Sequence, residues 1–493
     1  MRHPLLYQIN TRCWLQNLSR VERRPVTLAS VPETEFQFWR QCGFTHLWLM
    51  GVWTTGKRAR AIARQHPDLR AEYDRVLPGW TEADVAGSPY SIADYSVPKA
   101  LGGDEALREF RLKLNRIGIK LVLDFVPNHL GVDHAWVSER PELFVSSPTA
   151  THGTFTVETK TGVRFIANGK DPYFAPWTDV AQLDYRRAAT RQAVTEQLRE
   201  VARRCDGVRC DMAMLLLNEV FAKTWAHLPG AEPAPMEEFW PTAIPAVKSQ
   251  FPEFIFIAEV YWGLEGRLQA QGFDYTYDKA LYDDLIGRQP VEAQRKLLAH
   301  PSGYVEHSVH FLENHDEPRV AAKLSPAENR ASALAVLALP GMCLLHQGQL
   351  SGAKLKLPVQ LGRAPVEPES AEIKTIYMTL LNALPKTFIG QGAGQLLSPR
   401  AAWEGNFSHQ DFILVLWPGT QNRFDLVVVN LSANRGQAYA PLNFPALDEY
   451  DWSLRDWLGA EVFERVGSDL TQFGLYLDVP AHAAQIFRFE PKH

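Results

Sequence analysis

Four apolar runs that each end in charged or histidine residues form the most informative pattern in this chain. The run at 254–262 (FIFIAEVYW) stays apolar until Glu259. A short, nearly continuous apolar run of this kind predicts a strand buried on both faces. The other three runs are KLVLDFVPNH (120–129), GVRCDMA (207–213) and SVHFLENHDEPR (308–319). A carboxylate at the end of a buried strand is costly unless it has partners or a function, so these four strand ends are the first candidates for a site.

Strand-like and helical patterns alternate along most of the chain. Eight strands are predicted, at 3–10, 46–53, 120–127, 207–213, 254–261, 274–278, 308–316 and 342–350. Between them lie helical patterns such as 104–117, with Asp104 as the expected N-cap, and 325–339, with Ser325 and Glu328 as a capping box. Residues 54–87 read as a polar loop excursion with helical turns. Alternation predicts a parallel sheet, and eight units predict a closed (β/α)8 TIM barrel with its site at the carboxyl ends of the strands.

The alternation is interrupted once and later ends. Residues 131–183 are rich in Thr, Gly, Pro and aromatic residues with hairpin-like alternation, which predicts a small inserted subdomain after the third strand. Residues 386–493 contain short alternating runs that predict an antiparallel β-sandwich. The barrel is then expected to comprise residues 1–130 and 184–385.

Composition narrows the class of protein. The net charge of −5 argues against nucleic acid as a partner, because nucleic-acid binding requires a strong basic patch. No signal peptide and no apolar run near the length of a membrane span is visible, so we expect neither secretion nor a membrane partner. The five cysteines are odd in number and contain no CxxC pair, which favours reduced thiols and a cytoplasmic protein. We expect a monomer or a homodimer.

The four strand ends together resemble the motifs of the alpha-amylase family of glycoside hydrolases. DFVPNH resembles the family's strand-three motif, GVRCD its strand-four motif, AEVYW its strand-five motif and ENHD its strand-seven motif. Each motif alone is weak, but all four occur in the family's order, each at a strand end. The resemblance covers nearly the whole chain, and it implies a (β/α)8 barrel that cleaves α-glucosidic bonds with retention of configuration.

The resemblance also implies roles for individual residues. Asp211 is the expected nucleophile, Glu259 the general acid/base, and Asp316 a third carboxylate that binds sugar hydroxyls and keeps the acid protonated. Arg209, two residues before Asp211 on the same strand face, is expected to hold the nucleophile ionised. The expected substrate-binding residues are Tyr90, His129, Arg209, His315 and Trp262, and the expected structural supports are Asp124 and Asn128. Trp80 and Trp177 are equally compatible with cleft lining and with packing.

The chain departs from the family at several positions. Met214 and Leu215 stand where many relatives carry a Lys and a His, which makes the acceptor side unusual. Gln349 follows Gly348, where relatives often have an acidic residue. The chemistry requires no cofactor. Calcium stays open, with Asn128 and Asp179, or Asp184 in its place, as candidate ligands.

Three functions remain at this stage. The first is a retaining hydrolase of α-glucosidic bonds, α-1,4 in maltooligosaccharides or related α-glucans, acting through a covalent glycosyl-enzyme intermediate. The second is a glucan transglycosylase with the same residues, which transfers the glucosyl or maltosyl group to a sugar instead of water. The third is a non-catalytic amylase-like binding protein. In each case the expected partner is an oligosaccharide or an α-glucan.

Overall fold

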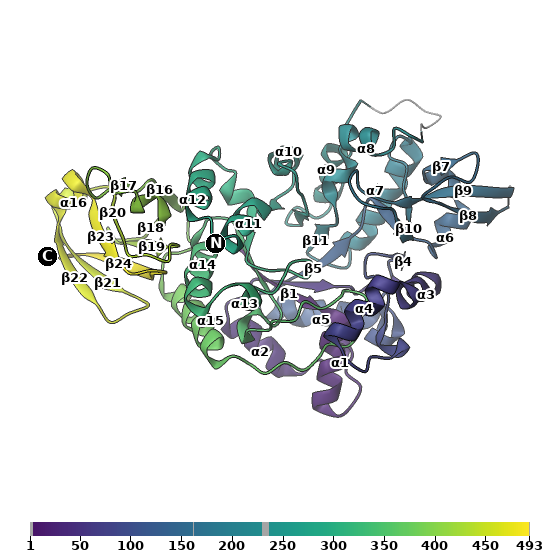
Figure 1. Ribbon diagram of the computed structural model, residues 1–493, viewed down its shortest axis with the longest axis horizontal. Coiled ribbons are helices and arrows are strands. Elements are labelled where there is room, and N and C mark those ends of the chain that lie inside the picture. Colours follow the sequence, from purple (N-terminus) through teal and green to yellow (C-terminus); the bar gives the residue numbers. More distant parts are fainter. Residues whose placement is uncertain (1–2, 161, 229–235, 493) are drawn as a thin grey trace.

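Eight parallel strands close into a barrel at the centre of the molecule (Figure 1). The computed structural model describes residues 3–160, 162–228 and 236–492. The strands follow one another around the barrel in the order β1-β2-β5-β11-β12-β13-β14-β15. Their bounds are β1 (Leu5–Asn10), β2 (His46–Met50), β5 (Lys120–Phe125), β11 (Gly207–Cys210), β12 (Ile255–Ala258), β13 (Tyr275–Tyr277), β14 (Ser308–Phe311) and β15 (Met342–His346). The predicted (β/α)8 barrel is confirmed, although most strands end before the polar residues of their motifs.

The strand register explains why the motifs meet. In the parallel pairing of β5 with β11, Asp124 lies opposite Arg209, and in the pairing of β11 with β12, Cys210 lies opposite Ala258. The residue after each strand therefore emerges at the same end of the barrel. Asp211 and Glu259 are these next residues on β11 and β12.

Helices cover the outside of the barrel (Figure 1). They are α1 (Thr11–Glu22), α2 (Glu33–Gln41), α5 (Gly103–Arg116), α7 (Ala188–Ala202), α8 (Asn218–Thr224), α9 (Trp240–Lys248), α10 (Glu265–Ala270), α11 (Lys279–Ile286), α12 (Pro290–Ala299), α13 (Val320–Lys323), α14 (Pro326–Ala338) and α15 (Ala371–Ala383). The capping box of α14 is present as predicted, with Ser325 and Glu328 each accepting from the other's backbone N–H.

The expected start of α5 is wrong. Gly102, with φ of 109°, is the N-cap of this helix, and Asp104 lies inside the first turn. A left-handed backbone of this kind favours glycine. The Asp104 carboxylate instead accepts a hydrogen bond from the backbone N–H of Val97 at 2.9 Å.

The excursion after β2 is more regular than predicted. It contains two complete helices, α3 (Lys57–Gln65) and α4 (Pro67–Val76). The short strands β3 (Thr54–Thr55) and β4 (Ile92–Asp94) pair at its base. The helical period of this stretch is hard to recognise in the sequence, because basic residues recur along it and few of its residues are large and apolar.

The insertion and the C-terminal part are antiparallel, as predicted. The insertion holds β6 (His129–Gly131), α6 (Ala135–Glu139), β7 (Ser146–Ser147), β8 (Thr154–Thr159), β9 (Gly162–Gly169) and β10 (Trp177–Gln182). The C-terminal part forms a six-stranded and a three-stranded sheet. Its elements are β16 (Gln395–Leu397), β17 (Arg400–Ala401), β18 (Phe412–Pro418), β19 (Phe424–Asn430), β20 (Gly436–Ala440), β21 (Asp451–Asp456), β22 (Val462–Val466), α16 (Gly467–Phe473), β23 (Leu475–Val479) and β24 (Ala484–Lys492).

The three parts lie along the molecule, with the C-terminal sheets at one end and the insertion at the other (Figure 1). The domain boundaries at 131, 183 and 386 stay predictions. Across the described part of the chain, none of the helices has the length and apolar character needed to cross a membrane.

Candidate active site

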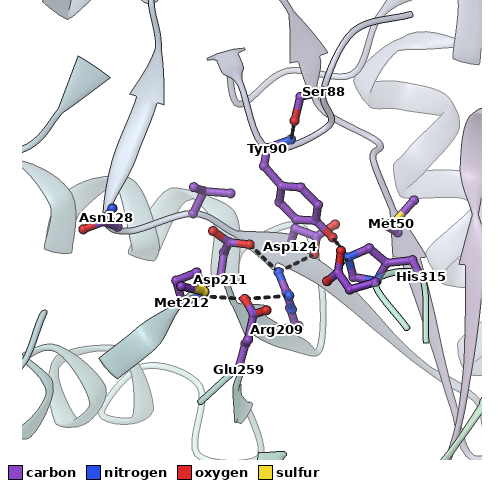
Figure 2. A network of polar contacts seen from close by, with 12 residues as sticks. Met50, Ser88, Tyr90, Asp124, Asn128, Arg209, Asp211, Met212, Glu259 and His315 are labelled. Carbon is purple, nitrogen blue, oxygen red and sulfur yellow. Dashed lines mark hydrogen bonds and ion pairs between the residues drawn. The ribbon is translucent and has the colours of Figure 1, made fainter. Parts of the chain in front are cut away.

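The buried guanidinium of Arg209 lies at the centre of the site and contacts two carboxylates (Figure 2). Its Nη1 donates to Oδ1 of Asp211 at 2.7 Å, and its Nη2 lies 2.7 Å from Oε2 of Glu259. Arg209 comes from β11, while Glu259 follows β12. One buried cation therefore holds the carboxylates of two neighbouring strand ends at close range.

Glu259 accepts further hydrogen bonds through both oxygens. The backbone N–H of Met212 donates to Oε2 at 2.7 Å, and the hydroxyl of Tyr261 donates to Oε1 at 2.7 Å. Burial raises the pKa of Glu259 to about 7, and the charges of Asp211 and Asp316 add to this rise, while Arg209 opposes it. We expected neighbouring negative charge to cause the rise; it contributes, but burial is the larger cause.

Asp211 is also buried. Burial raises the pKa of its carboxyl, and the charge and hydrogen bond of Arg209 oppose this rise without cancelling it. Arg209 therefore favours the ionised form as expected, but it does not outweigh burial. Asp124 braces the same guanidinium at 3.8 Å and accepts from the Trp48 indole and the Gly51 backbone, each at 3.2 Å.

A second chain of contacts links Tyr90 to Asp316 through His315. The Tyr90 hydroxyl lies 2.6 Å from Nε2 of His315, and the same nitrogen lies 2.9 Å from Oδ2 of Asp316. Gln8 holds the other ring nitrogen at 2.6 Å. Burial alone raises the pKa of Asp316, but His315 and Arg209 outweigh it and hold that pKa well below its usual range.

A cavity of about 400 Å³ lies at this site, and the predicted residues Arg209 and His315 are not among those that line it. Asp211, Glu259, Asp316, Tyr90 and His129 all line it. The insertion contributes Trp177 and Asp179 to the lining of the cavity. The ring of His129 packs edge-on to Trp177 at 5.3 Å, and burial lowers the pKa of His129 to about 3, so this imidazole is neutral near pH 7. The size falls within the range of ~300 to 1,000 Å³ typical of small-molecule sites.

Not every predicted residue reaches this cavity. Trp262 is 41% exposed and packs edge-on against Tyr173 at 5.0 Å, outside the residues that line the cavity. Trp80 packs against Tyr73 in a separate apolar cluster. Met214 and Leu215 are buried in the core, and Gln349 is a buried bridge between the His346 backbone and the Tyr377 hydroxyl.

Two contributors were missed in the sequence. Tyr261 contacts the Glu259 carboxylate, and alternation along an extended chain would have placed residue 261 on the same side as residue 259. Met212 contacts it through its backbone, which has φ of 43°. No pattern of side chains predicts a contact made by a left-handed backbone.

Two of the candidate calcium ligands, Asn128 and Asp184, do not fit a metal site because nitrogen donors already bind them. The buried Nε2 of Gln182 donates to the Asn128 carbonyl at 2.9 Å, to Asn128 Oδ1 at 3.0 Å and to the Leu183 carbonyl at 3.1 Å. An amide nitrogen thus lies where three oxygens converge. The Asp184 carboxylate is bound by Arg186 at 2.7 and 3.0 Å. In residues 3–160, 162–228 and 236–492, no group of three or more His, Cys, Asp or Glu side chains could hold a metal ion.

Known proteins resemble this chain in sequence over more than half of its length. The sequence profile described as "Alpha amylase, catalytic domain" matches residues 35–357, well over half of the chain. "Alpha-amylase MalA" of Haloarcula japonica is 25% identical over 279 residues, which make up 55% of this chain and 37% of that protein. The match thus spans little more than a third of that relative.

Solved structures of similar fold cover almost the whole chain. A maltogenic alpha-amylase, AmyB, of Thermotoga neapolitana superposes with a TM-score of 0.68 at 21% identity over 99% of both chains. A trehalose-6-phosphate hydrolase of Bacillus licheniformis gives a TM-score of 0.65 at 13% identity over 100% of this chain and 99% of that chain. At these identities the likeness shows the fold alone.

Proposed function

Because the chain belongs to the alpha-amylase family, we propose that it is a retaining glycosidase that cleaves α-glucosidic bonds, with α-1,4 bonds of maltooligosaccharides or related α-glucans as substrates. One observation carries the proposal: Asp211 and Glu259 each lie 2.7 Å from the guanidinium of Arg209 in a cavity that Asp316 also lines. Retaining enzymes hold their two carboxyl groups about 5–5.5 Å apart and inverting enzymes about 6.5–9.5 Å apart, and two carboxylates bound to one guanidinium are compatible with the shorter separation.

In the first step, an oxygen of the Asp211 carboxylate attacks the anomeric carbon. Glu259 gives its proton to the glycosidic oxygen, the bond between that oxygen and the anomeric carbon breaks, and a glycosyl ester on Asp211 forms. With a pKa of about 7, Glu259 carries the proton needed for this step at neutral and lower pH.

In the second step, Glu259 is a carboxylate and takes a proton from water as the water oxygen attacks the anomeric carbon. The ester bond breaks and Asp211 leaves as a carboxylate, so two inversions restore the α configuration. Asp316, with its lowered pKa, stays ionised through the cycle and can accept hydrogen bonds from sugar hydroxyls.

Transfer to a sugar acceptor is the second candidate. Met214 and Leu215 take the place of the family's Lys and His. Both are buried and apolar, so they give water no polar anchor on the acceptor side. A sugar hydroxyl competes with water for the same glycosyl ester, and the shape of the acceptor side decides which one reacts.

The test is the mass-resolved product profile from maltoheptaose, with wild type, Asp211→Asn and Glu259→Gln. We expect shorter products from wild type and a loss of rate of at least about a thousandfold in either variant, as is usual for a residue that acts on the reacting atoms. Products longer than the substrate would establish transfer. Turnover unchanged in Asp211→Asn, with the variant shown to be folded, would exclude the proposed chemistry.

We also propose a reducing, cytoplasmic location, and a monomer or homodimer as the working state. All five cysteines are buried and form no disulfide. We expect five reactive thiols after unfolding of protein purified without reductant, and fewer than five would contradict a reduced state.

A further inference from the structure

Two segments far apart in the chain pair at one edge of the cavity. The backbone N–H groups of Ala86 and Gly87 both donate to the Gln360 carbonyl, at 2.8 and 3.1 Å, and the N–H of Gly362 donates to the Asp84 carbonyl at 2.7 Å. Val85 and Leu361 form an antiparallel bridge between these bonds. We call residues 84–88 and 358–363 the donor-side wall. The donor side is the side that binds the sugars on the non-reducing side of the cleaved bond, and its assignment is argued below.

The donor-side wall has a core of its own. Val85 and Leu361 are buried in a cluster with Ala63 of α3, Tyr73 of α4 and Leu77, which follows α4. Arg363 holds the Asp84 carboxylate through two hydrogen bonds, at 2.6 and 2.9 Å. Bidentate pairs of this kind fix geometry as well as adding energy, so the wall is a packed element rather than a free loop.

Contacts with the site show on which side the wall lies. Ser88 and Gln360 line the same cavity as the carboxylates, and the Lys356 ammonium, just before the wall, contacts the Asp316 carbonyl. Tyr90 and Ser88 lie on the other side of Arg209 from Glu259 (Figure 2). Arg209 is 5.2 Å from the Tyr90 ring centre and 2.7 Å from Glu259.

The chemistry of bond cleavage indicates which of these two sides binds the leaving sugars and which binds the donor sugars. Glu259 protonates the leaving oxygen, so the sugars that leave lie on its side, toward Tyr261 and Met212. The sugar that reacts with Asp211 lies over Tyr90, and any further donor sugar must extend toward Ser88 and Gln360. The wall stands across that path.

We propose that the donor-side wall closes the cleft to the donor sugars and restricts the protein to bonds near a free non-reducing chain end. This inference rests on the proposed glycosidase function and adds exo-action to it. Gln360 and Ser88, both polar, line the cavity on this side, and the Ser88 hydroxyl accepts a hydrogen bond from the Tyr90 N–H at 3.2 Å. An internal segment of a long glucan cannot pass through paired backbone.

The test compares two p-nitrophenyl maltoheptaosides, one with a free non-reducing end and one whose non-reducing end carries a cyclic acetal. Products that retain the chromophore are separated and measured. We expect the free substrate to be cleaved with kcat/KM at least about a hundredfold higher than the blocked one, because a closed wall rejects added bulk by collision. Cleavage of both at comparable rates overturns exo-action but leaves the glycosidase proposal standing. Cleavage of neither overturns the glycosidase proposal on this substrate class, and exo-action with it.

A variant tests whether the donor-side wall causes the preference for a free non-reducing end. Asp84→Ala with Arg363→Ala removes the bidentate pair of the wall, and we expect the preference for the free end to fall about tenfold. The matched control is Arg435→Ala with Asp478→Ala, which removes a bidentate pair of 2.6 and 2.8 Å in the C-terminal sheets. An unchanged preference in the folded wall variant overturns the assignment to the wall. If that variant does not fold, the comparison of free and blocked substrates on wild type still decides the proposal.

Discussion

At the scale of single residues, opposing effects act on the pKa of the Glu259 carboxyl. Burial raises its pKa to about 7, whereas Arg209 and the Tyr261 hydroxyl favour its charged form. A general acid must be protonated, so kcat/KM is expected to fall as the pH rises through about 7. The balance of these contacts therefore sets the alkaline limit of activity.

Tyr261→Phe tests this balance. Removing a hydrogen bond to the carboxylate destabilises the charged form, so the pKa of Glu259 rises and the alkaline limb of the pH–kcat/KM profile moves to higher pH. Tyr439→Phe, in the C-terminal sheets, is the matched control and is expected to leave the limb in place. A limb that stays fixed or moves to lower pH in Tyr261→Phe would show that Glu259 does not set it.

A second prediction at this scale concerns the buried amide of Gln182. Gln182→Glu directs a buried carboxylate at three oxygens, and the variant in EDTA is expected to lose about 3 kcal/mol of unfolding free energy. Added calcium is expected to restore part of it, whereas wild type melts at the same temperature with EDTA or calcium. Gln250→Glu, at an exposed position, is the control. A Gln182→Glu variant as stable in EDTA as wild type would contradict our account of this oxygen cluster.

At the scale of elements, α14 shows how far local sequence determines structure. The Ser325 hydroxyl accepts from the Glu328 N–H, and the Glu328 carboxylate accepts from the Ser325 N–H at 2.7 Å. Ser325→Ala is expected to cost about 0.5–2 kcal/mol of unfolding free energy in urea, whereas Ser249→Ala near the end of α9 should cost less. Equal losses in the two variants would mean that the capping box contributes little to stability.

The other elements show where local reasoning fails. The strands and the carboxylates at their ends were predictable because apolar runs and motif order are local features. The start of α5 was not, because Gly102 uses a left-handed backbone that competes with the capping tendency of Asp104. The donor-side wall joins Asp84 to Arg363 across 279 positions, and no local pattern contains that pairing. The contact of Tyr261 could have been predicted from alternation along an extended chain, whereas Trp262 has a left-handed backbone, with φ of 68°, to which alternation does not apply.

At the scale of the whole molecule, part of the C-terminal sheets joins the apolar core of the barrel, while the rest forms a second cluster of its own. Trp417 of β18 is fully buried, donates to the Ala338 carbonyl at the end of α14 at 2.9 Å, and packs against the ring of His3 at 5.3 Å. Ile413, Val415 and Val427 belong to the same apolar cluster as the barrel. The two parts are therefore expected to unfold together.

Trp417→Ala tests this coupling. A fully buried Trp replaced by Ala leaves a cavity, and we expect a loss of about 3–5 kcal/mol and a lower melting temperature for one common calorimetric transition. Trp403→Ala, at a side chain that is 55% exposed, is the control and should change little. Two separate transitions, with only one shifted by Trp417→Ala, would show that the C-terminal sheets unfold independently.

The most direct test of the central claim is mass spectrometry of the Glu259→Gln variant quenched during reaction with α-glucosyl fluoride. Fluoride leaves without a proton, so Asp211 can still form the glycosyl ester, but water then attacks without its base and the ester accumulates. We predict a glucosyl adduct on the peptide that contains Asp211, and none in Asp211→Asn with Glu259→Gln. An adduct on another residue, or rapid hydrolysis without any adduct, would contradict the assignment of Asp211 as nucleophile and Glu259 as acid/base.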